Sequence, residues 1–183
     1  MKTGDLDILI LPGLGGGTED HWYQRWNGKL KTARIVEQDE WLNPDRDRWV
    51  STIVSAANSA DRPVFIIAHG LGTIALAHAA AQLDQANVVG AFLVAVPDLP
   101  SVQHLIPETS QFLPVPNGPL PFPSLMVASR NDPYSSYEKA EDAALDFGSL
   151  LVDAGEHGHL NDESGHGPWP EGLMALSKFL NRI

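Results

Sequence analysis

The chain contains no cysteine among its 183 residues. Disulfide bonds, thiolate catalysis and cysteine-ligated metal sites are therefore excluded. Positive charge is also scarce, because 12 lysines and arginines stand against 23 aspartates and glutamates and leave a formal net charge of -11. Nucleic acids and anionic membranes bind basic surfaces, so we expect neither of them as a partner.

Long apolar segments are missing as well. No stretch approaches the roughly 20 apolar residues that a membrane-spanning helix needs, and the start, Met1 to Asp5, carries no apolar signal region. We therefore expect a cytoplasmic protein. One domain over residues 1–183 is expected, because a domain usually holds roughly 100–200 residues and 43% of this chain is hydrophobic.

Short apolar runs alternate with segments of helical character along the chain. This alternation predicts a doubly wound α/β fold, with a mostly parallel central sheet and helices on both of its faces. The runs are rich in branched aliphatic residues, as is typical of strands buried on both sides. Strands are predicted at residues 6–11, 34–36, 64–68, 90–95, 124–129 and 149–152.

The first two helices are predicted from aromatic spacing and from capping residues. Trp22 and Trp26 recur at i, i+4 spacing within residues 19–30 and are expected to pack into the core. The next helix is predicted to have Asn43 as its N-cap and Pro44 in its first turn. Further helices are predicted over residues 73–81, 135–146 and 170–180.

Residues 99–123 are rich in proline, and we expect little regular structure over most of this segment. A long loop in a compact domain often forms a lid or one wall of a binding site. An ordered crossover on the surface is the alternative. The sequence does not choose between these two interpretations.

One strand and one helix are joined by a very tight turn. The predicted strand 64–68 is followed by residues 69–72 and then by an alanine-rich helical segment. This pattern is typical of a nucleophile elbow, in which a serine sits at a positive φ between small neighbours two residues away on either side. Ala68 and Gly72 are such neighbours, but Gly70 occupies the position of the serine. The sequence therefore presents a hydrolase elbow without its nucleophile.

The first predicted strand ends in a glycine-rich loop, residues 12–17. We favour an oxyanion loop, in which the backbone N–H of Leu14 pairs with that of Leu71 to receive a developing negative charge. A dinucleotide-phosphate loop with Glu37 as the ribose ligand is an alternative, and a plain turn is another. Thr18 stands where the dinucleotide pattern has its third glycine, and two acidic residues follow it where a pyrophosphate would sit.

Two further candidates each follow a predicted strand, Asp132 after the fifth and His159 after the sixth. Because the carboxyl ends of parallel strands meet at one edge of a sheet, we expect both side chains beside the elbow. Their order along the chain, nucleophile position then acid then histidine, is that of the α/β-hydrolases. Helix capping by Asp132 and an ordinary loop position for His159 are the alternatives. Asp98 is the reserve acid, and His157 and His166 are the reserve bases.

Several motifs occur together over most of the chain. They are Leu11-Pro12-Gly13 with His21-Trp22 and Trp26, Asp39-Glu40-Trp41 with Pro44 and Trp49, Ala68 to Gly72, Ser129 to Tyr134, and Gly158-His159 with Ser164 to Pro170. In this combination the chain resembles the small serine hydrolases typified by retinoblastoma-binding protein nine and the bacterial YdeN-like proteins.

This resemblance implies an α/β-hydrolase-like three-layer sandwich and a small ester, amide or thioester as the substrate, with no cofactor and no metal. It implies Asp132 as the acid and His159 as the base of a Ser–Asp–His triad. Family members usually carry serine where this chain has Gly70.

Three accounts of Gly70 remain open at the level of sequence. The chain is a hydrolase whose nucleophile has been removed, a noncatalytic descendant that binds a ligand in the same pocket, or a weak hydrolase in which His159 activates water. The preferred interpretation is a protein of the serine hydrolase family that acts on a small molecule. A ligand-binding pseudoenzyme is the alternative. The sequence makes no prediction about oligomeric state.

Overall fold

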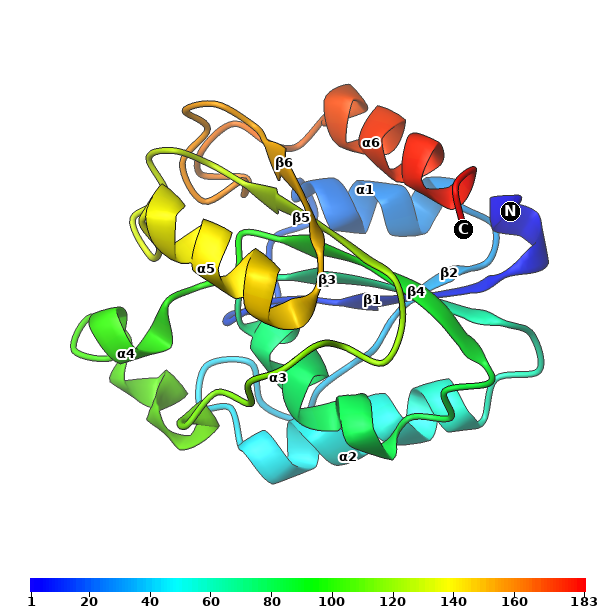
Figure 1. Cartoon of the computed structure of the whole chain (residues 1–183), viewed down its shortest axis with the longest axis horizontal. Coiled ribbons are helices and arrows are strands. Elements are labelled where there is room, and N and C mark those ends of the chain that lie inside the picture. The colour runs from blue at the N-terminus through cyan, green and yellow to red at the C-terminus, as the bar shows by residue number, and fades with distance from the viewer.

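Six strands form one sheet in the computed structural model, which describes residues 1–183 (Figure 1). The strand order is β2-β1-β3-β4-β5-β6, and every neighbouring pair is parallel. The predicted α/β fold is confirmed, and the sheet is parallel throughout. The strands are β1 (Asp7–Leu11), β2 (Ala33–Ile35), β3 (Val64–His69), β4 (Val88–Val94), β5 (Ser124–Ala128) and β6 (Leu150–Asp153).

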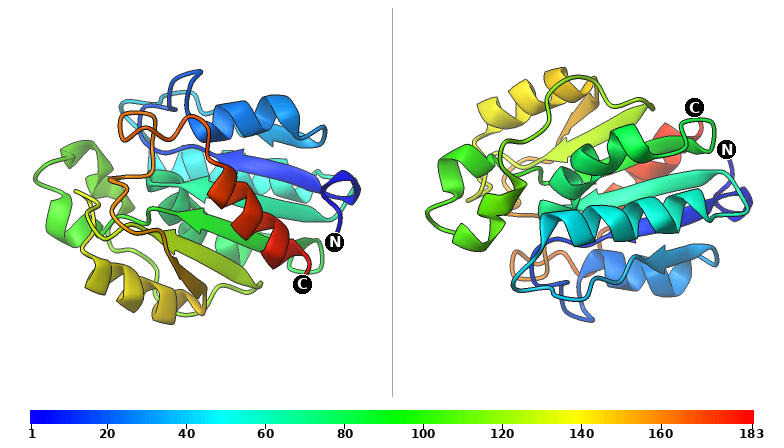
Figure 2. Two further views of the ribbon diagram at one scale, coloured as in Figure 1. Left: turned by 90° about the horizontal axis from the view of Figure 1, so that it is seen from above. Right: turned by 90° about the horizontal axis from the view of Figure 1, so that it is seen from below.

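Helices cover both faces of the sheet and complete the three-layer sandwich. Helices α1 and α6 lie on one face, and α2, α3 and α5 lie on the other (Figures 1 and 2). No helix combines the length and the apolarity that crossing a bilayer requires. The α-helices are α1 (Trp22–Lys29), α2 (Arg46–Asn58), α3 (Leu71–Ala79), α4 (Leu99–Val102), α5 (Tyr137–Phe147) and α6 (Pro170–Leu180), and the 3₁₀ helices are η1 (Thr3–Asp5), η2 (Ala80–Gln82) and η3 (Pro107–Phe112).

The central strands are buried on both sides, and their side chains alternate between two cores. In β3, Ile66 points into the core shared with α2, α3 and α5, whereas Phe65 points into the core shared with α1 and α6. This double burial explains why the strands are almost continuously apolar in the sequence. Trp22 and Trp26 belong to the second core, as predicted.

The predicted start of the second helix is wrong. Helix α2 begins at Arg46, and its N-cap is Asp45, whose carboxylate accepts a hydrogen bond from the Arg48 backbone N–H at 2.9 Å. Pro44 and Asn43 both precede this cap. Asparagine and aspartate cap helices about equally well, so capping preference alone does not choose between them. The start of α1 is also later than predicted, at Trp22.

Most of the proline-rich segment 99–123 lacks regular structure, as predicted, and its two short helices are α4 and η3. Phe112 and Thr109 of η3 are fully buried, so this part of the segment is packed onto the body of the protein. Leu99 and Ile106 line a cavity of about 390 Å³, where the segment forms one wall. Of the interpretations left open by the sequence, one wall of a cavity is therefore the one that describes residues 99–123.

The turn between β3 and α3 depends on a close approach of two backbone segments. A Cβ atom at Gly72 would lie 2.3 Å from the carbonyl oxygen of Leu11 and 2.6 Å from that of Pro12. Real carbon atoms do not approach backbone oxygens so closely. Ala68, on the other side of the turn, is fully buried. The small residues at these two positions are thus required by packing.

Replacing Gly72 with alanine should destabilise the protein by about 1–3 kcal/mol, the usual cost of overpacking a close contact. The free energy of unfolding in urea would measure this change. Gly28 in α1 is the matched control, because a Cβ there meets no atom within 4 Å. Gly28→Ala should stabilise the protein by about 0.4–1 kcal/mol. Equal changes in the two variants would contradict the role given to Gly72.

Candidate active site

A cavity of about 390 Å³ opens at the carboxyl edge of the sheet. The loops that follow β1, β3, β5 and β6 all contribute residues to its lining, together with the segment that contains α4 and η3. The structure therefore brings the elbow, the Asp132 loop and the His159 loop to one edge, as the strand order predicts.

Gly70 has the backbone conformation of a nucleophile elbow. Its φ is 52° and its ψ is -126°, and it is the N-cap residue of α3. A Cβ atom built at this position would lie 3.2 Å from Nε2 of His159. A side chain at position 70 would thus point directly at the imidazole. Thr73 offers no substitute, because its hydroxyl donates a hydrogen bond to the Gly70 carbonyl oxygen at 2.7 Å.

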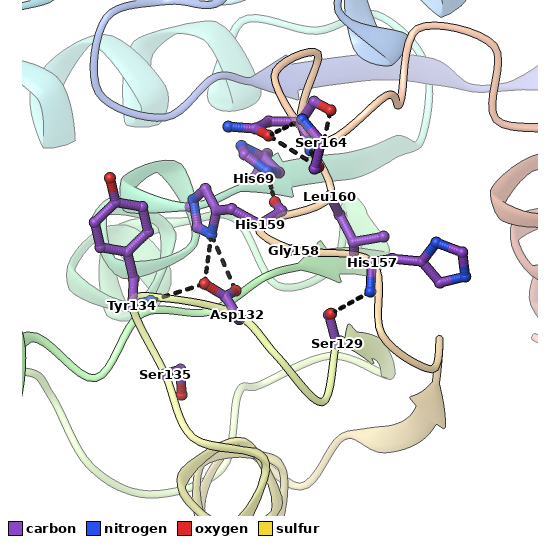
Figure 3. Close-up of polar contacts among 12 residues, drawn as sticks. His69, Ser129, Asp132, Tyr134, Ser135, His157, Gly158, His159, Leu160 and Ser164 are labelled. Atoms are coloured by element: carbon purple, nitrogen blue, oxygen red, sulfur yellow. Dashed lines mark hydrogen bonds and ion pairs between the residues drawn. The ribbon is translucent and has the colours of Figure 1, made fainter.

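Asp132 and His159 form a buried pair (Figure 3). Nδ1 of His159 lies 3.0 Å from each carboxylate oxygen, and the two side chains are 3% exposed for Asp132 and 14% for His159. The backbone N–H of Tyr134 donates to Oδ1 of Asp132 at 2.9 Å. A carboxylate accepts hydrogen bonds, so Nδ1 carries a proton and Nε2, which faces Gly70, is free to accept one. Asp132 does not cap α5, because Ser136 does.

Two backbone N–H groups border the cavity without an acceptor from the protein. Those of Leu14 and Leu71 donate no hydrogen bond to any backbone or side-chain atom, and both residues line the cavity. Gly13 lies against the elbow, since a Cβ on it would lie 3.2 Å from the carbonyl oxygen of His69 and 3.4 Å from the backbone nitrogen of Leu71. These amides are available to an anionic group bound beside the elbow.

The backbone around His159 is fixed by two buried side chains. Nε2 of His69 donates to the carbonyl oxygen of His159 at 2.9 Å, and the indole N–H of Trp22 donates to that of Leu160 at 2.8 Å. Burial lowers the pKa of His69 well below its ordinary value, so the ring is neutral and keeps the proton on Nε2. The positive φ of Leu160, 50°, is held by these contacts.

Comparison with known proteins agrees with this geometry. Residues 8–178 match the family model described as serine hydrolase. The chain belongs to the serine hydrolase family. A search of curated proteins finds no significant match.

Solved structures of the serine hydrolase family and of the wider fold are similar to this chain. A YdeN-like hydrolase from Pectobacterium atrosepticum is 33% identical, with 97% of this chain and 91% of that chain covered and a TM-score of 0.84. The ydeN gene product of Bacillus subtilis is 20% identical, over 95% and 98% of the two chains, with a TM-score of 0.78. Est1E from Butyrivibrio proteoclasticus, solved with ferulic acid bound, is 13% identical over 97% and 88%, with a TM-score of 0.68. The last two show the fold alone.

In this serine hydrolase family member, two side chains from the Asp132 loop clamp the His159 loop. Oδ1 of Asn131 accepts from the backbone N–H of Gly158 at 2.7 Å. Oγ of Ser129 accepts from the backbone N–H of His157 at 2.9 Å (Figure 3). The Ser129 hydroxyl in turn donates to Oδ1 of Asn131 at 3.0 Å. The sequence places these residues in a motif, but it does not show which distant backbone groups they bind.

The reserve candidates lie elsewhere. The carboxylate of Asp98 accepts a hydrogen bond from the Ser101 hydroxyl and does not contact His159. The rings of His157 and His166 are 5.1 Å apart and line a different cavity. Glu37 is exposed after β2, and α1 begins only at Trp22, so the glycine loop does not lead directly into a helix as a dinucleotide site requires.

Replacing Asn131 with leucine should loosen the His159 loop, because the Gly158 amide loses its acceptor. We expect hydrogen exchange at that amide to accelerate by about tenfold, since a typical hydrogen bond contributes about 1 kcal/mol and more when one partner is left unpaired. NMR would measure the hydrogen-exchange rate of the Gly158 amide. Asn131→Asp keeps an acceptor oxygen and should preserve the protection. Unchanged protection in the leucine variant would contradict the clamp.

The buried histidines predict a loss of stability in mild acid. Burial lowers the pKa of His21 from 6.5 to about 4, so the unfolded chain binds a proton below pH 6.5 that the folded chain binds only near pH 4. Stability should therefore fall as the pH drops through this range, by about 3 kcal/mol for His21 alone. Urea unfolding from pH 7 to pH 4 would measure the loss. His21→Phe should reduce it by about that amount, and an identical pH dependence in the variant would refute this assignment.

Proposed function

We propose that this chain carries the active site of a hydrolase for a small ester, amide or thioester, complete except for the nucleophile. His159 is the general base, Asp132 orients it, and the Leu14 and Leu71 amides receive the oxyanion. Gly70 occupies the nucleophile position. Membership of the serine hydrolase family supports the reaction class.

The observation that carries this proposal is the geometry at Gly70. The 3.2 Å between a Cβ at this position and Nε2 of His159 leaves a serine hydroxyl within hydrogen-bond reach of the base. Asp132 contacts Nδ1 on the other side of the ring, so the proton stays on Nδ1. Nε2, which faces the elbow, is therefore unprotonated. A cavity of about 390 Å³ has the size of a small-molecule site.

Without a side chain at position 70, no acyl-enzyme forms, and the remaining route is direct attack by water. Nε2 of His159 takes a proton from a water beside Gly70 as the water oxygen bonds to the substrate carbonyl carbon. The Leu14 and Leu71 amides stabilise the resulting oxyanion, and the imidazolium returns the proton to the leaving group as its bond breaks. Triad enzymes that lack a member retain roughly 10³–10⁴-fold acceleration over water, so turnover by this chain is slow.

The same cavity supports a second candidate function, a noncatalytic ligand-binding protein. Gly70 itself favours this candidate, because the cavity keeps its lining while the residue that forms the covalent bond in the family is absent. A pseudoenzyme of this kind would bind a small molecule at the same edge of the sheet. Restoring the serine separates the two candidates.

Gly70→Ser should create a reactive nucleophile, because glycine and serine both adopt the backbone conformation of the elbow. Intact-mass spectrometry after treatment with a fluorophosphonate should show one covalent adduct on the variant and none on the unmodified chain. Hydrolysis of short-chain esters should rise by at least about 10⁴-fold, because loss of one triad member lowers kcat by roughly 10⁴–10⁶-fold.

Adding His159→Ala to the serine variant is the control, since it removes the base and leaves the serine in place. This double variant should lose both the adduct and the ester hydrolysis. A folded Gly70→Ser protein that neither labels nor hydrolyses esters would contradict the hydrolase proposal and favour the ligand-binding protein.

A further inference from the structure

The cavity has two walls of different chemistry. Leu99 of α4 and Ile106, just before η3, form an apolar wall. Thr18 from the loop after β1 and Asp162 from the loop after β6 belong to a polar wall. Helix α4 and the loop after β6, drawn in orange, lie on opposite sides of the carboxyl edge of the sheet (Figures 1 and 2).

Asp162 carries a charge that nothing in the protein neutralises. Its carboxylate accepts hydrogen bonds from the Thr18 hydroxyl and from the Glu163 backbone N–H, and both donors are neutral. No lysine, arginine or histidine forms an ion pair with it. Partial burial alone would raise the pKa of Asp162, but the hydrogen bond from Thr18, the electrostatic effect of the nearby His21 and the backbone hydrogen bonds outweigh it and lower the pKa, so the group stays ionised.

One other acidic residue on this wall adds to the negative charge. Glu163 also lines the cavity, and the nearby Asp20 is already paired with Arg25 at 2.8 Å. His21, which is 2% exposed and lines the same wall, has Nδ1 buried without a hydrogen-bond partner. Because this nitrogen has almost no exposed surface, the polar groups that an occupant can reach on this wall are those of Thr18, Asp162 and Glu163.

We infer that the cavity selects small esters or amides in which one substituent of the scissile carbonyl is apolar and the other carries a positive charge. The apolar substituent lies along Leu99 and Ile106, and the cationic substituent lies against Asp162, which determines the specificity. This assignment rests on the proposed function, because it takes the Gly70 edge as the place of the carbonyl. It names the substrate class of that same site.

Binding to the chain as it stands tests this specificity, since Gly70 prevents the formation of an acyl-enzyme. Two pairs of ligands differ only in a quaternary nitrogen or the matching carbon. They are butyrylcholine with 3,3-dimethylbutyl butyrate, which place the charge on the alcohol side, and the N-butyl amides of betaine and of 3,3-dimethylbutanoic acid, which place it on the acyl side. Dissociation constants would come from NMR titration.

In at least one pair the cationic ligand should bind about tenfold more tightly than its carbon analogue, as expected for one charge pair near the protein surface. Asp162→Asn keeps an acceptor for Thr18 and should reduce the preference to less than about twofold, with the neutral ligand unaffected. Asp61→Asn, an exposed change at the opposite edge of the sheet, should leave the preference intact. High salt should weaken the preference, because the pair is partly exposed.

Equal affinities within both pairs, or no saturable binding of either cationic ligand, would overturn the inference. A preference that survives Asp162→Asn would overturn the role of this residue. Fluorophosphonate labelling of the Gly70→Ser variant reports separately on the proposed function. Labelling without a preference for cations refutes the specificity alone, whereas a preference without labelling refutes the hydrolase and leaves a cation-selective binding site.

Discussion

Helix α3 meets the end of β1 at direct backbone contact, because Gly72 has no side chain to hold the two segments apart. This contact sets the shape of the turn between β3 and α3. The turn requires a positive φ at Gly70. This backbone conformation directs a side chain at position 70 toward Nε2 of His159. It also leaves the Leu71 amide unpaired at the border of the cavity, where the Leu14 amide lies as well. The geometry of the site is thus a consequence of how tightly the sheet and helix pack.

In the proposed function, Gly70 separates two requirements that coincide in a serine hydrolase. Glycine adopts a positive φ without strain, so the turn keeps its shape without a side chain at position 70. The pairing of Asp132 with His159 involves no atom of residue 70, and the unpaired amides belong to the backbone. Only the covalent bond to substrate depends on the side chain itself. In the proposed function, the chain keeps the family scaffold, and residue 70 decides the chemistry.

Much of the fold and the positions of the elbow, Asp132 and His159 could be predicted from the sequence, because doubly buried strands are continuously apolar and parallel strands end at one edge. The start of α2 could not, since Asn43 and Asp45 are comparable caps and the sequence does not show which of them caps the helix. The clamp by Asn131 and the charge of Asp162 on the cavity wall also escaped prediction. Both depend on contacts between residues far apart in the chain, which periodicity and motif spacing do not encode.

In the proposed active site, the base and the oxyanion donors are already in place around Gly70. A crystal structure of the Gly70→Ser variant after reaction with a fluorophosphonate would test it most directly. The account predicts the phosphonyl oxygen within about 3 Å of both the Leu14 and Leu71 backbone nitrogens, and Nε2 of His159 beside the serine Oγ. A phosphonyl oxygen turned away from these amides, or a serine directed away from His159, would contradict it.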